Sequence, residues 1–142
     1  MVALVAGAVI GLVGWLIVGS VYHGMARLFG GVGTWKETLL GVAWCSIPYV
    51  AKSVLWIPQL LIFGREMFTS QTPLIDSNIV FMALFYFFGL IELVFFVWYY
   101  VVLSHGMGEI HGFSAWKGFV SVVLPPVVLF ALMFVIAGIL YG

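Results

Sequence analysis

The sequence is short of charge. Of its 142 residues only 7% are charged, five of them basic and five acidic, whereas roughly a quarter of the residues of an ordinary soluble domain carry charge. So few charged side chains cannot cover the surface of a soluble domain of this size, which excludes that class of protein. The basic residues are also scattered. They form no stripe that could displace counterions from a phosphate backbone, so we expect no nucleic-acid partner.

Cysteine and catalytic signatures are equally scarce. The one cysteine, Cys45, lies in an apolar run, so the chain can form no intrachain disulfide, and we expect the thiol to act as a small packing group. No serine, cysteine or carboxylate pair has the neighbours that nucleophilic or acid-base catalysis requires, and no glycine-rich phosphate loop follows a strand. We therefore expect a protein that is not an enzyme.

The sequence is rich in long apolar stretches. Hydrophobic residues make up 65% of the chain, and its mean hydropathy is +1.26. About 20 apolar residues in helical form cross a bilayer, and the chain supplies four such stretches, which we place at about residues 2–22, 38–63, 77–103 and 117–141. The expected fold is all-α: a multi-pass bundle of four transmembrane helices that forms one domain over residues 1–142.

Two prolines lie inside the second stretch. Pro48 and Pro58 each lack an N–H, so we expect that helix to be kinked or locally unwound, with neighbouring groups satisfying the freed carbonyls. The first stretch has neither a basic leader nor an evident cleavage site, so a true span is favoured over a removable signal peptide.

Short polar segments predict where the helices begin and end. Gly30 and Gly31 should stop the first helix, and Thr34 with Glu37 forms a capping box that starts the second. Gly64 should end the second helix.

The boundaries of the third and fourth helices are predicted from helix-capping residues and two glycines. Asp76 or Ser77 is expected to cap the third helix. Gly106 and Gly108 should then break the chain, and Ser114 should cap the last helix.

The distribution of basic residues predicts the orientation. The loops after the first and third spans share one side and hold Arg27, Lys36 and Lys117, whereas the opposite loop holds Arg65. Because cytoplasmic loops are enriched in lysine and arginine, the first side is expected to be cytoplasmic. The histidines fall on that side: His23, His105 and His111.

The two loops on that side are similar in sequence. His-Gly-Met occurs at 23–25 and again at 105–107, and Trp-Lys follows at 35–36 and at 116–117. Two interpretations stay open: two related helical hairpins, or the ordinary preference for such residues where a helix leaves a membrane.

Two motifs carry a family resemblance. Residues 27–34 read Arg-Leu-Phe-Gly-Gly-Val-Gly-Thr and lead to Ser-Ile-Pro at 46–48, and residues 109–114 read Glu-Ile-His-Gly-Phe-Ser. This pattern resembles the Ypt-interacting-protein (Yip) membrane domain family, and Trp-Ile-Pro at 56–58 is similar to an element of its prokaryotic members. The motif residues are Gly30, Gly31, Gly33, Thr34, Pro48, Glu109, His111, Gly112 and Ser114.

The resemblance implies an architecture and a function. Family members usually have five spans, so this chain is expected to lack the first of them. Eukaryotic members organise vesicle traffic through Rab-type GTPases, while prokaryotic members have no settled activity. We therefore expect a membrane-organising or trafficking-type interaction protein whose partners are the bilayer, another membrane protein or a small GTPase, and a second copy of the chain. The small residues Ala3, Gly7 and Gly11 on the first helix let helix backbones approach closely, either within the bundle or between two copies of the chain.

Two charged residues fall well inside predicted spans. Lys52 and Glu92 lie near the centres of the second and third stretches. An unpaired charge at mid-membrane costs on the order of 3 kcal/mol or more, so we expect the two to pair, to be neutralised, as by protonation of Glu92, or to face a water-filled cavity. The pair is interpreted either as a structural pin between helices or as part of a transporter pathway for a proton, an ion or a lipid headgroup.

Four residues of the cytoplasmic loops have the chemistry of metal ligands: His23, His105, Glu109 and His111. Imidazole and carboxylate groups suit zinc or a similar divalent ion. Their spacing matches no strict metal motif, and Glu109 with His111 could instead bond backbone groups of the turn before the last helix. The alternative function is therefore a transporter or an ion- or metal-binding protein that uses the Lys52–Glu92 pair and this histidine cluster.

Overall fold

The structure is a computed structural model that describes residues 2–141. Across those residues the regular secondary structure is helical throughout. Four segments are long and apolar enough to cross a membrane: Val5–Leu28, Trp35–Phe68, Ile79–His111 and Ala115–Leu140. The expected all-α, multi-pass architecture is thereby confirmed.

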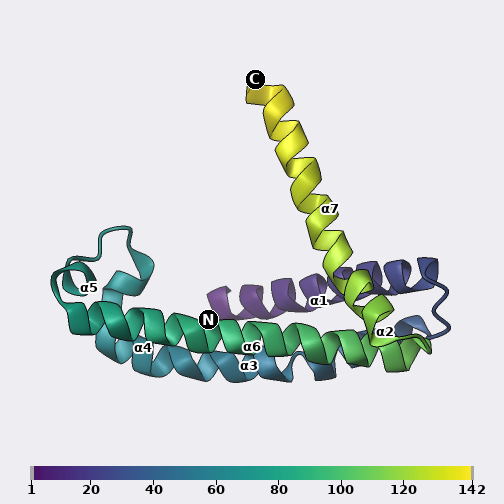
Figure 1. Cartoon of the computed structure of the whole chain (residues 1–142), viewed down its shortest axis with the longest axis horizontal. Helices are drawn as coiled ribbons and strands as arrows, with labels where there is room; N and C mark the ends of the chain where they lie inside the picture. The colour runs from purple at the N-terminus through teal and green to yellow at the C-terminus, as the bar shows by residue number, and fades with distance from the viewer. Residues whose placement is uncertain (1, 142) are drawn as a thin grey trace. The chain divides into compact units, whose positions relative to one another are not determined.

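Seven α-helices and two 3₁₀ turns follow one another along the described chain (Figure 1). They are α1 (Val2–Leu28), α2 (Trp35–Cys45), α3 (Ile47–Lys52), η1 (Ser53–Leu55), α4 (Trp56–Phe63), η2 (Gly64–Phe68), α5 (Pro73–Ser77), α6 (Ile79–His111) and α7 (Ala115–Tyr141). The chain divides into two compact units. The first is Met1–Cys45 with Tyr100–Gly142, and the second is Ser46–Tyr99.

The second apolar segment is broken where its prolines predict. Helix α2 ends at Cys45, just before Pro48, and the 3₁₀ turn η1 comes directly before α4, which contains Pro58. Proline supplies no N–H for the helical bond to the carbonyl four residues earlier and crowds that carbonyl. The expectation of a kinked or unwound span is therefore confirmed.

The first predicted boundaries also hold. The Thr34 N–H donates to Glu37 Oε2 at 2.8 Å, and the Glu37 N–H donates to Thr34 Oγ1 at 3.3 Å, which is the reciprocal capping box. Helix α1 ends before Gly30, whose φ of 83° is readily adopted only by glycine. Helix α4 likewise ends before Gly64, where φ is 54°.

The predicted cap of the third long helix is wrong. Asp76 and Ser77 lie within the short helix α5, and Asp76 accepts a hydrogen bond from the Thr72 hydroxyl at 2.9 Å. Helix α6 is capped instead by Asn78, whose Oδ1 accepts the Val80 N–H at 2.9 Å.

The predicted break at Gly106 and Gly108 is also wrong. Helix α6 runs through both glycines and ends at His111, so its 33 residues extend about 50 Å, further than the roughly 30 Å hydrocarbon core. A Cβ on Gly106 would come within 2.5 Å of Cys45 Sγ, so this glycine serves close packing rather than a turn. The chain turns at Gly112, where φ is 67°.

In the first unit, α1 packs against both α2 and α7 (Figure 1). The indole N–H of Trp15 donates to the Leu39 carbonyl at 3.2 Å, which ties α1 to α2. Helix α7 lies so close to the end of α6 that a Cβ on Gly118 would collide with the Ser104 carbonyl. The buried apolar side chains of this unit include Ala26, Leu103, Met107 and Val122.

In the second unit, Phe63 joins α4 to the first part of α6. Its ring is 3% exposed and meets the rings of Phe81, Phe85 and Phe88 edge-on, with centroids 6.5, 5.8 and 6.3 Å away. Edge-to-face contacts of this kind are favourable for aromatic pairs. This aromatic cluster packs α4 against α6 and so helps to position the polar groups described below.

Candidate functional site

Three polar side chains meet where α1, α2 and α6 come together. Thr38 and His111 are almost fully buried, with 0% and 1% exposure, and His23 is half-buried. Thr38 Oγ1 lies 3.0 Å from His23 Nδ1 and 3.0 Å from His111 Nε2. We call His23, Thr38 and His111, together with Gly31 and Gly33, the histidine junction.

The hydroxyl of Thr38 fixes the hydrogen-bond directions in the junction. It also lies 3.0 Å from the Thr34 carbonyl oxygen, which accepts its single proton. The same oxygen then accepts an N–H from each imidazole, so the network assigns the proton of neutral His111 to Nε2. His111 Nδ1 is buried and has no hydrogen-bond partner among the described residues.

The two glycines allow the backbone to lie against the His111 ring. A Cβ on Gly31 would be 2.6 Å from His111 Nδ1, and a Cβ on Gly33 would be 2.6 Å from a carbonyl oxygen of α6. Between them, the Val32 N–H donates to the His111 carbonyl at 3.1 Å. The Phe113 ring stacks on the imidazole at 5.6 Å. The Gly31 and Gly33 backbone and the Phe113 ring therefore pack closely around His111.

The remaining motif residues shape the ends of the helices. Gly30 and Gly112 have positive φ, and Thr34 forms the capping box. Ser114 directly precedes α7, and its carbonyl accepts the Gly118 N–H at 3.1 Å. Glu109 is exposed on α6, and Pro48 lies buried in α3 of the second unit.

The four expected metal ligands are not gathered. His23 and His111 both bond Thr38, whereas His105 and Glu109 are exposed. Among residues 2–141, no three His, Cys, Asp or Glu side chains are placed to hold a metal ion. The alternative interpretation also needs correction, because the His111 side chain bonds the Thr38 hydroxyl and not the backbone of the turn.

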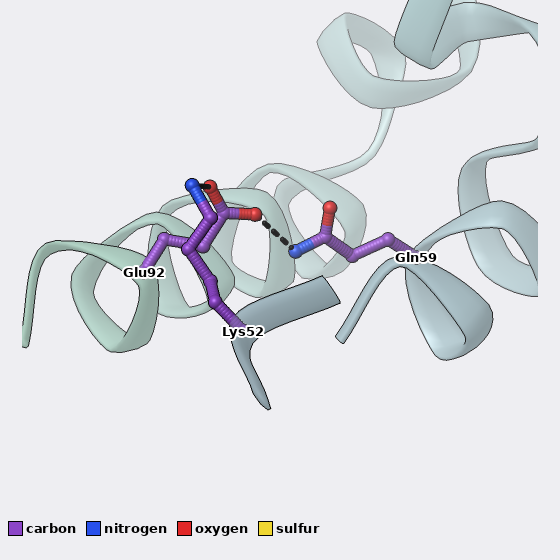
Figure 2. A network of polar contacts seen from close by, with 3 residues as sticks. All are labelled: Lys52, Gln59 and Glu92. Carbon is purple, nitrogen blue, oxygen red and sulfur yellow. Dashed lines mark hydrogen bonds and ion pairs between the residues drawn. The ribbon is translucent and has the colours of Figure 1, made fainter. Parts of the chain in front are cut away.

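A second polar cluster lies in the second unit. Lys52 Nζ of α3 is 3.4 Å from Glu92 Oε2 of α6, and Gln59 Nε2 of α4 donates to Glu92 Oε1 at 2.9 Å (Figure 2). We call Lys52, Gln59 and Glu92 the polar triad. Sequence reasoning placed Lys52 opposite Glu92 but missed Gln59. A signal was present, because Gln59 follows Lys52 by seven residues, which is about two helical turns and so the same helix face.

A cavity of about 230 Å³ adjoins the polar triad. Its lining residues are Gln59, Phe85, Tyr86, Phe88, Gly89 and Glu92. The side chains of Lys52 and Glu92 are 19% and 28% exposed. The Lys52 ammonium also lies 5.2 Å from the centroid of the Tyr49 ring, within cation–π range.

Comparison with known proteins identifies the family. The family model of the Yip1 domain matches residues 1–137. The chain belongs to the Yip1 domain family. The match covers both compact units and both sequence motifs, while no curated protein and no solved structure matches the chain. Yip1 domain proteins are generally non-catalytic, and in this Yip1 domain the motif residues Gly31, Gly33 and His111 form a packed junction.

Proposed function

We propose that this Yip1-domain protein is a membrane-organising interaction protein of the trafficking type. The observation that supports the proposal most is the closed histidine junction. His111 is 1% exposed, bonds Thr38 and packs on glycine backbone, so this motif histidine helps to hold the helix ends together. A fixed arrangement of helix ends is what a docking surface requires.

The partner would bind the exposed side chains around the histidine junction. Trp35 and Trp116 are 44% and 77% exposed, and a lysine follows each, Lys36 and Lys117. Aromatic and basic residues are typical of the boundary between a membrane and the cytoplasm. With the family resemblance, this composition supports a cytoplasmic small GTPase as the partner, with a second copy of the chain as the competing occupant.

The test uses a photo-crosslinking amino acid at the two ends of one helix. Placed at Trp116 in native membranes, it should capture a small GTPase. Placed at Ile139, which is 75% exposed near the other end of α7, it should capture lipid alone. If the probe at Trp116 captures a second copy of the chain, the partner is that copy and not a GTPase. Equal capture of the GTPase from Trp116 and Ile139 would contradict the proposed surface.

A transporter is the second candidate, favoured by the polar triad. An ion pair and an amide within apolar segments are features of substrate and ion pathways. If the triad forms a pathway, replacing Lys52→Met and Glu92→Leu together should abolish proton or ion flux into proteoliposomes while the protein still assembles. If flux persists in this double variant, or if the parent shows no flux, the triad serves only to connect the helices.

A further inference from the structure

The cavity beside the polar triad presents hydrogen-bond acceptors. Glu92 and Gln59 line it, whereas Lys52 contacts Glu92 from outside the lining. The Gln59 amide uses its NH₂ to donate to Glu92, and in Figure 2 its oxygen points away from that carboxylate. Within residues 2–141 that oxygen accepts no hydrogen bond, and it is not among the fully buried polar atoms, so a ligand can reach it. A ligand here must therefore bring N–H or O–H donors, and the carboxylate favours a cation over an anion.

The walls of the cavity also suit a cation. Phe85, Tyr86 and Phe88 contribute aromatic rings, whose faces attract positive charge when water is excluded. Gly89 leaves the wall open, since a Cβ there would meet no atom within 4 Å. At about 230 Å³ the space is below the range of whole drug-sized ligands, so it suits a headgroup. An apolar tail can extend over the exposed rings of Phe85 and Tyr86.

Lys52 makes a second favourable contact besides its ion pair. Its ammonium is 3.4 Å from Glu92 Oε2 and also lies over the Tyr49 ring. It can thus give up the carboxylate to an incoming cation and keep the cation–π contact. Two cations near one carboxylate are less favourable than one, so Lys52 acts as a competitor of the ligand.

We propose that this cavity binds a primary ammonium group on an apolar tail, held by Glu92 and Gln59 in competition with Lys52. The shared chemistry is that of a free alkylamine and of an aminophospholipid headgroup. The inference goes beyond the interaction function and does not depend on it. It requires only that the ligand binds and not that it is transported, so it is also independent of the transport alternative.

The experiment titrates decylamine into the full chain in nanodiscs of phosphatidylcholine, a lipid that has no primary ammonium, and measures binding by calorimetry. The double variant Lys52→Met/Glu92→Leu in the same nanodiscs is the control for partition into lipid. The parent should bind saturably. Glu92→Gln should weaken binding at least about tenfold, because a charge-assisted hydrogen bond is lost. Decyltrimethylammonium, which has no N–H donors, should bind less tightly than decylamine.

The most distinctive result is expected for Lys52→Met. Removing the competitor should raise the affinity for decylamine, and the amine should raise the melting temperature of this variant more than that of the parent. A purely structural ion pair predicts no such gain. If Lys52→Met does not fold, Lys52→Gln and the comparison of the parent with Glu92→Gln replace it. Equal binding by the parent and Glu92→Gln, or no gain in a folded Lys52 variant, would overturn the proposal.

A second lipid composition distinguishes the two sources of the ammonium. When phosphatidylethanolamine replaces part of the phosphatidylcholine, an aminophospholipid ligand should compete and lower the apparent affinity of the parent for decylamine. An unchanged affinity assigns the cavity to free amines. The double variant, which lacks both charged groups, should respond to neither lipid.

Discussion

The histidine junction and the polar triad both join helices through polar side chains, but they do so in opposite ways. The junction contains no carboxylate, its Thr38 and His111 are 0% and 1% exposed, and glycine backbone packs against it. The triad carries a full ion pair, its Lys52 and Glu92 are 19% and 28% exposed, and a cavity adjoins it. Motif residues make the packing contacts of the junction, whereas the three residues of the polar triad lie outside the motif and adjoin a cavity.

The largest effect should come from removing one charge of the triad. Lys52→Met leaves Glu92 without its ion-pair partner, which should lower the free energy of unfolding by about 3 kcal/mol. Adding Glu92→Leu should restore most of that loss, because the apolar pair needs no partner in a membrane. Reversible unfolding in mixtures of bicelles and sodium dodecyl sulfate measures both variants. A single variant as stable as the double variant would show that the ion pair does not connect these helices.

A smaller effect separates two glycines. Gly31→Ala should cost about 2 kcal/mol, because its Cβ would come within 2.8 Å of the Ala26 carbonyl oxygen as well as against His111, and backbone cannot yield as a flexible side chain does. Gly89→Ala, beside the polar triad, meets no atom and should stabilise α6 by up to about 1 kcal/mol. The same unfolding measurement checks both. Equal tolerance at the two positions would mean that the junction is not closed.

The smallest effect should come from zinc. In the junction both imidazoles bond the Thr38 hydroxyl and not a metal ion. The positively charged Arg27 guanidinium also lies nearby and donates to the Gly31 carbonyl at 3.1 Å. Zinc should therefore not raise the melting temperature of the protein. Metal content per purified chain provides the second readout. Near-stoichiometric metal that disappears in His111→Ala would restore the predicted metal site and contradict the closed junction.

The parts of the fold that depend on local sequence could be predicted. The four long apolar stretches predict the four membrane-spanning segments, and Pro48 and Pro58 predict that the second segment is broken. Thr34 and Glu37 predict the capping box. The continuation of α6 through Gly106 could not be predicted, because it depends on Cys45, which is distant in sequence.

The candidate sites divide in the same way. The cost of a lone charge in a membrane made pairing of Lys52 with Glu92 one of three expected outcomes, and the structure shows the pair. The role of Thr38 could not be predicted, because a threonine on an amphipathic helix is ordinary until α1 and α6 bring two imidazoles to its hydroxyl. The metal hypothesis placed four residues of suitable chemistry together, but the helical continuation to His111 leaves His105 and Glu109 exposed.

The most direct test of the closed histidine junction is a double-mutant cycle between Thr38→Val and His111→Leu, with stability measured by reversible unfolding. We predict that the two losses are not additive and that the coupling is about 1–2 kcal/mol, the size of a buried hydrogen bond. The matched control pairs Thr38→Val with Glu109→Ala on the exposed side of the same helix end, where the losses should add. Additive losses for Thr38 and His111 would contradict the claim that the family histidine serves to hold α2 and α6 together.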